Sequence, residues 1–444
     1  MSFIERPRST CALGGALATI GDLPGVVPIS HTPSGCAGNL SGATAFGSGN
    51  SGSGYCSGGS VPVSNVGEKQ VIFGGDKRLR EEIEIALDIL DADLFVVTTG
   101  CMTEIIAEDI NGVVRDFRDD GKPVTYVNTP SFEGDAYKGY DIVMNEILNN
   151  YIPVSRTKDK KLVNILGIIP QFDPFYRGDL EEIKRLLEKL GLKVNTFFTE
   201  DQTFANIKSA SKASLNIVFS QVRGISVAER FAEKHKTPYV VENLPIGSVE
   251  TDRFLKNIGK LMGIETSRVN AVIKEENRRY YTYLQRTTDF HGDGELKYYV
   301  DIAVNANQAI PFASFVEKEL GWIVENVAVT DVLSNAETER IKEQYSAQKL
   351  KGNLVFEKNT NDIEKLFVRS TKQSNGNYFQ DTHTPVYLIG STLDKNFAQK
   401  VAGGSLFVSY PVFNRVIVNK GYAGYNGGLN LFQDIYDSIV PGRI

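Results

Sequence analysis

Several features that would assign this chain of 444 residues to a common functional class are scarce or missing. Positive charge is not in excess, because 48 Lys and Arg residues face 54 Asp and Glu residues, a formal net charge of −6. A nucleic-acid-binding protein is therefore not expected. No run approaches 18 uninterrupted apolar residues, which argues against a membrane span. Neither a GxGxxG segment between a strand and a helix nor a GxxxxGK[ST] segment occurs, so no nucleotide-binding loop is expected.

Cysteine is scarce and unevenly placed. The four cysteines lie at positions 11, 36, 56 and 101, and none occurs in the last three quarters of the chain. A disulfide scaffold would not be confined to one end of so large a chain. Arg6 and Arg8 precede an apolar stretch over residues 12–20, but glycines inside it and Asp22 after it argue against a signal peptide. We therefore expect a cytoplasmic protein whose thiols serve metal or redox chemistry.

From residue 68 onward, short apolar runs alternate with segments of helical periodicity. Hydrophobic residues make up 41% of the chain and charged residues 23%, which is typical of a folded protein. The alternation predicts an α/β fold of two to three Rossmann-like, doubly wound domains with parallel sheets covered on both faces. Strands are expected at residues 70–73, 94–97, 124–127, 162–169, 215–219, 239–243, 298–304, 323–332, 354–357, 386–389 and 406–410. One continuous helix is expected over residues 103–117 and another at the C-terminus over residues 423–440.

The length and pattern predict four parts: an irregular cluster-binding segment over residues 1–67, and domains over 68–155, 156–290 and 291–444. Between positions 34 and 60, sixteen of 27 residues are Gly or Ser. Because Cys36 and Cys56 interrupt that stretch, we expect a close-packed loop around something bulky, in preference to a flexible linker.

Every cysteine has a glycine nearby, among them Gly14, Gly15, Gly35, Gly54 and Gly100. Glycine would let the backbone approach an iron–sulfur cluster, whose thiolate ligands come from loops and strand ends. The spacing is not the C-x₂-C pattern of zinc sites. The residues alone leave two alternatives open, which are cluster ligands or four buried thiols that pack as small hydrophobes.

Segments spread over nearly the whole chain resemble, in order, the component 1 proteins of nitrogenases and nitrogenase-like reductases. The N-terminal ones are Cys11 before a small-residue turn, HTPSGC ending at Cys36, EKQVIFGG over residues 68–75 and TTGCMTEIIAEDI over residues 98–110. Near the C-terminus, SYPVFNR over residues 409–415 and GYAGYNGG over residues 421–428 resemble the signature of the same family.

The resemblance implies three Rossmann-like domains and an α2β2 heterotetramer of two homologous subunits. It implies an interface iron–sulfur cluster, either an eight-iron P-cluster or a 4Fe–4S cluster, with Cys11, Cys36 and Cys101 as its ligands. Cys56 matches no ligand of the family and is either a fourth ligand or an unrelated thiol. A separate ATP-dependent iron–sulfur protein would supply low-potential electrons, which fits the missing phosphate-binding loop.

The resemblance favours a β-type subunit. No cysteine follows Cys101, so the mid-chain thiol that anchors the metal cofactor of a catalytic α subunit is missing. Gly100 before Cys101 and Ala107 in place of a common glycine depart from the β-type pattern. The chain also lacks the long N-terminal extension of molybdenum nitrogenase β subunits, so an oxygen-sensitive, nitrogenase-like reductase matches at least as well as a dinitrogen-reducing enzyme.

The leading hypothesis is an oxidoreductase subunit that relays electrons through the cluster to a metal cofactor or substrate site in its partner. The alternative is a scaffold subunit for metal-cofactor assembly, and a third reading is an α/β binding protein with incidental cysteines. The substrate and the catalytic residues are not indicated.

Histidines and carboxylates near these motifs carry weaker signals. His31 is expected either to hydrogen-bond beside the cluster or to be purely structural, and His235 to be solvated. His291 and His383 lie in polar segments and are not expected to bind metal. Three carboxylates, Glu104, Glu108 and Asp109, are expected to stabilise the helix N-terminus after Cys101.

Overall fold

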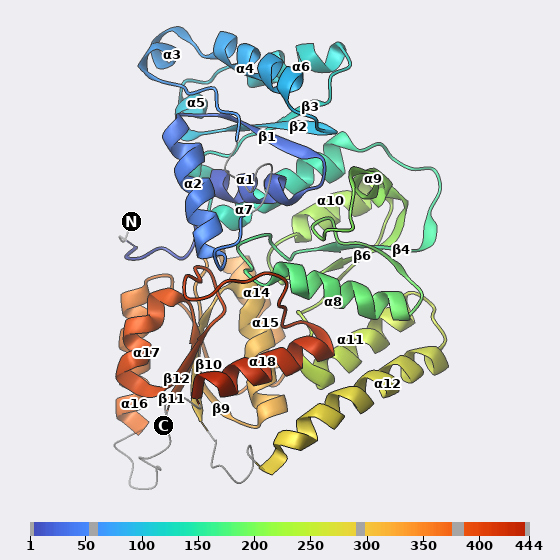
Figure 1. The fold of residues 1–444 in the computed structure, drawn as a ribbon, viewed down its shortest axis with the longest axis vertical. Helices are drawn as coiled ribbons and strands as arrows, with labels where there is room; N and C mark the ends of the chain where they lie inside the picture. The colour runs from blue at the N-terminus through green and yellow to red at the C-terminus, as the bar shows by residue number, and fades with distance from the viewer. Residues whose placement is uncertain (1–3, 53–60, 290–297, 375–385, 440–444) are drawn as a thin grey trace.

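Three parallel β-sheets with helices packed around them form the computed structural model, which describes residues 4–52, 61–289, 298–374 and 386–439. The first sheet lies at the top of Figure 1, the second at the right and the third at the lower left. All pairings between strands in the three sheets are parallel, so the predicted α/β class is confirmed. In the part of the chain that the structure describes, no helix is long and apolar enough to cross a membrane.

The first sheet has the order β1-β2-β3. Its strands are β1 (Val26–His31), β2 (Leu94–Thr99) and β3 (Val124–Val127), and the first two are buried along their whole length. The surrounding helices and turns are α1 (Ala12–Asp22), α2 (Ser34–Gly47), α3 (Glu68–Phe73), α4 (Asp76–Ile89), α5 (Cys101–Ile105), α6 (Ile110–Asp119), η2 (Ser131–Glu133), α7 (Ala136–Asn145) and η3 (Glu146–Tyr151).

The prediction of irregular structure over residues 1–67 is wrong for residues 12–47, which form α1, β1 and α2. In α2, Ala37 packs against Leu13 and Leu17 of α1, with Leu40 beside them, and this apolar stripe at helical spacing holds the helix in place. Glycines at 35, 38 and 42 have no described residue, apart from the backbone of their own helix, within 4 Å of the point where a side chain would project. The division of the chain near residues 155 and 290 stays a prediction.

Two further predictions about the first sheet are wrong. Residues 70–73 were expected to form a strand but belong to α3, where Ile72 and Phe73 are exposed. The helix expected over residues 103–117 is broken into α5 and α6, because Ala107 adopts the left-handed conformation with φ of +54°. A side chain at that angle cannot continue a right-handed helix.

The second sheet has the order β5-β4-β6-β7. It consists of β4 (Asp159–Leu166), β5 (Lys193–Asn195), β6 (Ala213–Val218) and β7 (Tyr239–Val241). Its helices and turns are α8 (Tyr176–Lys189), α9 (Phe204–Ser209), η4 (Ala210–Lys212), α10 (Ile225–His235), α11 (Gly247–Leu261), α12 (Thr266–Leu284) and η5 (Gln285–Thr287).

The third sheet has the order β10-β9-β8-β11-β12. Its strands are β8 (Tyr299–Val304), β9 (Ile323–Val329), β10 (Asn353–Phe356), β11 (Val386–Gly390) and β12 (Ala402–Phe407). The helices and turns that follow or cover them are α14 (Ala306–Phe315), η6 (Val316–Leu320), α15 (Asn335–Ala347), α16 (Thr360–Ser374), η7 (Thr392–Asp394), α17 (Lys395–Val401) and α18 (Gly424–Ile439).

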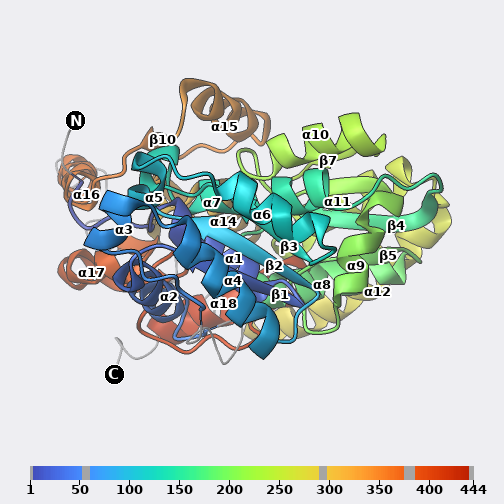
Figure 2. The same ribbon diagram turned by 90° about the horizontal axis from the view of Figure 1, so that it is seen from above.

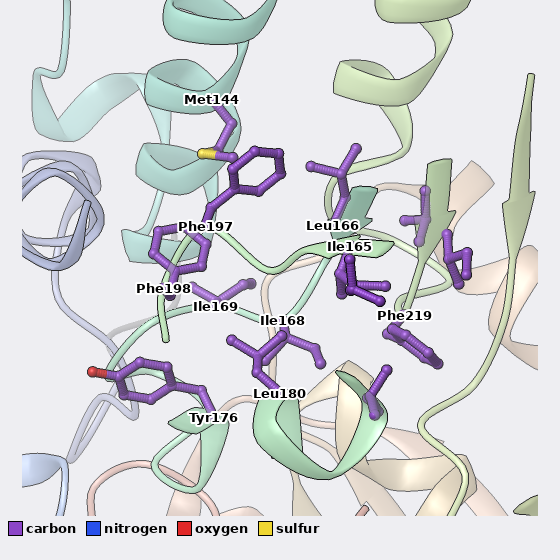
Figure 3. Close-up of a cluster of buried hydrophobic side chains, with 14 of the residues drawn as sticks. Met144, Ile165, Leu166, Ile168, Ile169, Tyr176, Leu180, Phe197, Phe198 and Phe219 are labelled. Atoms are coloured by element: carbon purple, nitrogen blue, oxygen red, sulfur yellow. The ribbon is translucent and has the colours of Figure 1, made fainter. Parts of the chain in front are cut away.

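One hydrophobic core joins the first and second sheets. Figure 3 shows Met144 of α7 beside Phe197 and Phe198, close to Ile165 of β4. The α1 helix packs on α7 at close range, because a side chain on Gly15 would overlap the carbonyl of Ala136. Gly15, four residues after Cys11, therefore serves helix packing, which was not expected from the sequence.

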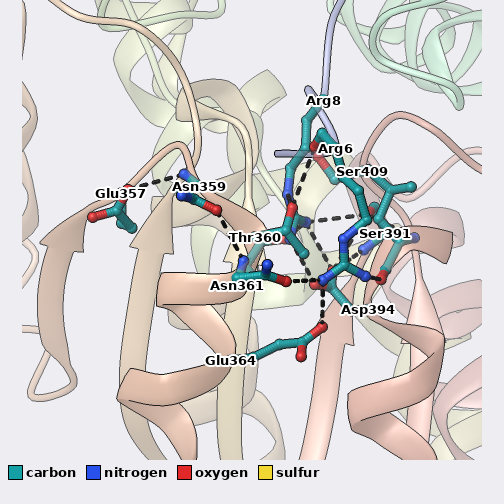
Figure 4. A network of polar contacts seen from close by, with 12 residues as sticks. Arg6, Arg8, Glu357, Asn359, Thr360, Asn361, Glu364, Ser391, Asp394 and Ser409 are labelled. Atoms are coloured by element: carbon teal, nitrogen blue, oxygen red, sulfur yellow. Dashed lines mark hydrogen bonds and ion pairs between the residues drawn. The ribbon is translucent and has the colours of Figure 1, made fainter. Parts of the chain in front are cut away.

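A buried ion pair ties the N-terminus to the third sheet (Figure 4). The Arg8 guanidinium donates through Nη1 to Asp394 Oδ2 at 2.8 Å and through Nη2 to Asp394 Oδ1 at 2.5 Å. Both side chains are 3% exposed. Because Arg8 lies only three residues before Cys11, this pair fixes the start of the segment that carries the first cysteine.

Candidate metal centre

Cys36 and Cys101 lie beyond the carboxyl ends of two neighbouring strands. His31 ends β1 and pairs in register with Thr99, which ends β2. Cys36 is in the first turn of α2 and Cys101 is the first residue of α5. The two loops touch, because a side chain on Gly100 would meet Thr32 Cγ2 at 2.7 Å. The topology of the sheet, not the sequence spacing, thus brings these two thiols to one edge.

Cys11 reaches the same edge through the loop that follows β3. Cys11 forms an isolated antiparallel bridge with Asp135, and the flanking backbone bonds are Ala12 N–H to Gly134 O at 3.0 Å and Ala136 N–H to Thr10 O at 2.8 Å. Ser131 of the same loop binds Cys101 twice: the thiol donates to Ser131 Oγ at 3.0 Å, and the Ser131 N–H donates to Cys101 Sγ at 3.2 Å. The loop therefore links the first cysteine to the third.

Cys36 lies close enough to Cys11 and Cys101 to interact with both electrostatically. Burial raises the pKa of the Cys36 thiol, and the charges of Cys11 and Cys101 raise it further. All three cysteines are free, and Cys36 is exposed. Cys11 is the N-cap of α1, so each of the three lies at the first turn of a helix.

The three cysteine thiols suit a metal cluster better than a single metal ion. Among the described residues, no three His, Cys, Asp or Glu side chains are arranged to hold a single metal ion. Three thiols from separate loops that meet at one edge fit the ligand chemistry of an iron–sulfur cluster.

His31 connects the end of β1 to two other segments through side-chain hydrogen bonds. Its ring is fully buried, with Nδ1 2.8 Å from Ser64 Oγ and Nε2 2.5 Å from Glu108 Oε2. Burial lowers the pKa of His31 in spite of the opposing effect of Glu108. Glu108 also accepts a hydrogen bond from the Gly75 N–H, so this residue joins the turn before α4 to the end of β1. Both ring nitrogens are occupied by these partners, which favours the structural alternative.

The other polar predictions have mixed outcomes. Asp109 caps α6 by accepting from the Gly112 N–H at 2.8 Å, so it serves the N-terminus of this second helix and not that of α5, which follows Cys101. The prediction that His235 is solvated is wrong: it is 2% exposed, and its Nε2 lies 2.9 Å from the Leu148 carbonyl oxygen, because this face of α10 packs on η3. Cys56, His291 and His383 lie outside the described residues.

A rim of exposed apolar side chains lies on the elements around the cysteines. It comprises Ile72 and Phe73 of α3, Ile105 one helical turn after Cys101, and Phe132 next to Ser131, which are between 64% and 79% exposed. Figures 1 and 2 both show α2, α3 and α5 on the side of the first sheet that faces away from β4. Exposed apolar clusters of this kind mark protein interaction surfaces.

Comparison with known proteins agrees with this arrangement. The family model described as nitrogenase component 1 type oxidoreductase matches residues 11–440. The chain belongs to this family. The resemblance found in its motifs is thereby confirmed.

Relatives within the family have several roles. The nitrogenase molybdenum-iron protein beta chain of Methanococcus maripaludis is 24% identical over 98% of this chain and 94% of its own length. The molybdenum-iron protein alpha chain of Methanothermobacter thermautotrophicus is 26% identical over 97% of this chain and 87% of its own. The iron-molybdenum cofactor biosynthesis protein NifE of M. maripaludis is 27% identical over 61% of this chain and 55% of its own.

The fold is also shared with a solved nitrogenase structure. Nitrogenase Cp1 at pH 6.5 superposes with a TM-score of 0.80 at 19% identity, over 99% of this chain and 94% of that one. The Rossmann-like architecture expected from the sequence is therefore confirmed.

The contacts that organise the site were not visible in the sequence. Ser131 and Asp135 carry no motif of their own, and Glu108 was expected only to stabilise a helix end. A signal for Ser131 and Asp135 does exist, because they follow β3, the next strand of the sheet, whose carboxyl end must lie at the same edge.

Proposed function

We propose that this chain is the β-type subunit of a nitrogenase-like reductase and relays low-potential electrons through an interface iron–sulfur cluster. The observation that carries the proposal is the convergence of Cys11, Cys36 and Cys101 at one sheet edge, each in the first turn of a helix. The cluster, of the eight-iron P-cluster type or a 4Fe–4S type, would take up and release single electrons. The chain's own residues would hold it as thiolates.

The polar surroundings support this role. The Ser131 N–H donates to the Cys101 sulfur at 3.2 Å, and hydrogen bonds to ligand sulfurs tune the reduction potential of a cluster. The helix N-termini would offset part of the negative charge of three thiolates. The loops carrying Cys36 and Cys101 are also tied together, since Thr103 Oγ1 donates to the His31 carbonyl at 3.2 Å.

The apolar rim supports a partner subunit on this face. A homologous α-type subunit in an α2β2 heterotetramer would cover Ile72, Phe73, Ile105 and Phe132 together with the cysteines, and would exclude water from the cluster. A transient ATP-dependent iron–sulfur protein would deliver electrons in the cytoplasm, and the metal cofactor or substrate site would lie in the α-type partner.

The cluster assignment is tested by metal analysis of the anaerobically co-purified complex. Cys36→Ala should lose most of the iron and sulfide together with the cluster's electron paramagnetic resonance signal, because one of three protein ligands is gone. Cys56→Ala is the matched control and should keep both. Equal loss in the two variants would refute the three-ligand assignment.

A second candidate function is a scaffold on which a metal cofactor is assembled, and the similarity to NifE favours it. Turnover of a reducible substrate by the purified complex with its reductase supports the electron relay. Transfer of a cluster precursor from this complex to an apo-enzyme, without turnover, supports the scaffold.

A further inference from the structure

A pocket of about 320 Å³ lies between the C-terminal part of α12, the end of α14 with η6, and α18. Figure 1 shows α12 and α18 side by side. Because η6 leads directly into β9, the pocket lies near the amino ends of the strands of the third sheet. It is therefore at the opposite end of that sheet from the loops that follow its strands, and none of the described cysteines lines it.

Aromatic side chains from three helices form much of the apolar wall of this pocket. Tyr280 and Tyr281 come from α12, Phe315 from α14 and Phe432 from α18. Tyr280 and Phe315 are buried, whereas Tyr281 is 51% exposed, so the pocket has a rigid floor and an open side. The rings of Tyr280 and Tyr281 meet edge to face, with centroids 5.4 Å apart. The negative faces of aromatic rings attract organic cations.

One carboxylate, that of Glu319, lies in the same pocket. Its Oε1 accepts a hydrogen bond from the Val249 N–H at 2.9 Å, and its Oε2 lies 3.4 Å from the Tyr280 hydroxyl. Burial raises the pKa of Glu319, and no positively charged side chain of the described chain opposes this effect. The neighbouring Lys318 pairs with Glu250 at 2.7 Å. Glu319 is thus a partly buried carboxylate whose described partners are all neutral.

The local backbone turns Glu319, and not its neighbour, towards the pocket. The η6 segment is a π-helical turn that continues α14, and such turns are frequent at functional sites. Glu317 of the same turn accepts from the Lys351 N–H at 3.0 Å and the Gly352 N–H at 3.2 Å, outside the pocket. Two carboxylates of one turn therefore have different roles, and Glu317 offers a matched comparison for Glu319.

We propose that this pocket binds an organic ammonium ion, whose charged group lies against Glu319 and the aromatic rings while its apolar part contacts Leu284 and Leu320. A carboxylate among aromatic walls is complementary to such an ion in both charge and polarity. An anion would be repelled by Glu319. A single carboxylate cannot replace the six or so oxygen ligands that Mg²⁺ or Ca²⁺ requires, so a metal ion is not the favoured ligand.

Three probes with the same carbon chain test the proposal by calorimetric titration of the purified full-length protein in its complex. They are hexylamine, which is cationic, hexan-1-ol, which is neutral, and hexanoate, which is anionic. We expect hexylamine to bind roughly tenfold more tightly than hexan-1-ol, because only the ammonium pairs with Glu319 and the ring faces, and hexanoate to bind most weakly. Equal binding of hexylamine and hexan-1-ol, or no hexylamine binding up to about 10 mM, overturns the proposal.

Glu319→Gln removes the charge but keeps an oxygen that can accept from the Val249 N–H. It should weaken hexylamine roughly tenfold and change the affinity for hexan-1-ol by less than about twofold. Glu317→Gln is the matched control, because it removes the same charge from the same turn outside the pocket, and it should leave all three affinities unchanged. Unchanged hexylamine binding in Glu319→Gln also overturns the proposal. If that variant does not fold, the order of the three probes on the wild-type complex decides.

Discussion

The ion pair between Arg8 and Asp394 gives the sharpest prediction about how the N-terminal cysteine is held. Replacing Asp394 by Asn removes the charge but keeps the size of the side chain. It leaves the Arg8 guanidinium buried with only neutral partners: Ser391 Oγ at 3.1 Å, Thr360 Oγ1 at 3.3 Å and the Ala303 carbonyl at 3.5 Å. We expect the N-terminal segment to detach from the third sheet.

The size of the effect follows from burial. Both side chains are 3% exposed, and breaking a buried pair by removing one charge costs about 3–5 kcal/mol. Replacing both partners with apolar residues, as in Arg8→Met with Asp394→Leu, should cost much less than the sum of the single changes, because no uncompensated charge remains. The surface pair between Arg6 and Glu364 is the control, since Arg6 is 35% exposed and its loss should cost less than about 1 kcal/mol.

Limited proteolysis combined with thermal unfolding measures this effect for Asp394→Asn, Arg8→Met, Asp394→Leu, the double variant and Arg6→Ala. Asp394→Asn should expose the first ten residues to cleavage, lower the Tm and reduce the bound iron, because Cys11 lies three residues after Arg8. Arg6→Ala should resemble the wild type in all three measurements. If Asp394→Asn resembles Arg6→Ala, or if the double variant is as unstable as the two single variants combined, the reasoning about burial is refuted.

Three further changes test separate parts of the structure. Burial raises the pKa of Asp301 to about 7, so the free energy of unfolding falls as the pH rises from about 4 towards 7. Asp301→Asn should therefore raise the Tm more at pH 8 than at pH 5. An equal change in Tm at both pH values would contradict the destabilising effect of the buried Asp301 carboxylate. Ala107→Gly should stabilise the protein by roughly 0.5–1 kcal/mol in thermal unfolding, because Ala107 has a φ of +54°, and a lowered Tm would count against strain there. Phe132→Asp should reduce co-purification of the partner subunit. Ile89→Asp is the control and should not reduce it, because Ile89 is about as exposed but lies before the start of β2, at the opposite edge of the sheet from the cysteines.

The strands that were predicted best are buried on both faces and therefore appear as continuous apolar runs. The segment Leu94–Thr99 is the clearest example, since all six residues are buried. The Gly/Ser-rich α2 was not predictable from composition, because its apolar packing on α1 outweighs a poor helix propensity. The run at residues 70–73 was mistaken for a strand because its apolar residues form part of an exposed rim, not of a sheet.

The site was predictable only through its family motifs. The cysteines are 25 and 65 residues apart, and nothing in their spacing shows that β1 and β2 pair in register and bring two of them together. Contacts between distant residues leave no local signal, which is why the ion pair between Arg8 and Asp394 emerged only from the structure. His235 was misjudged for the same reason, since charged neighbours in sequence concealed a buried face.

The most direct test of the account is anomalous diffraction at the iron edge from crystals of the anaerobically prepared complex. The account predicts iron peaks in bonding contact with the sulfurs of Cys11, Cys36 and Cys101, at the face shared with the partner subunit. Ordered sulfurs with no iron between them, or iron bound only elsewhere in this chain, would contradict it.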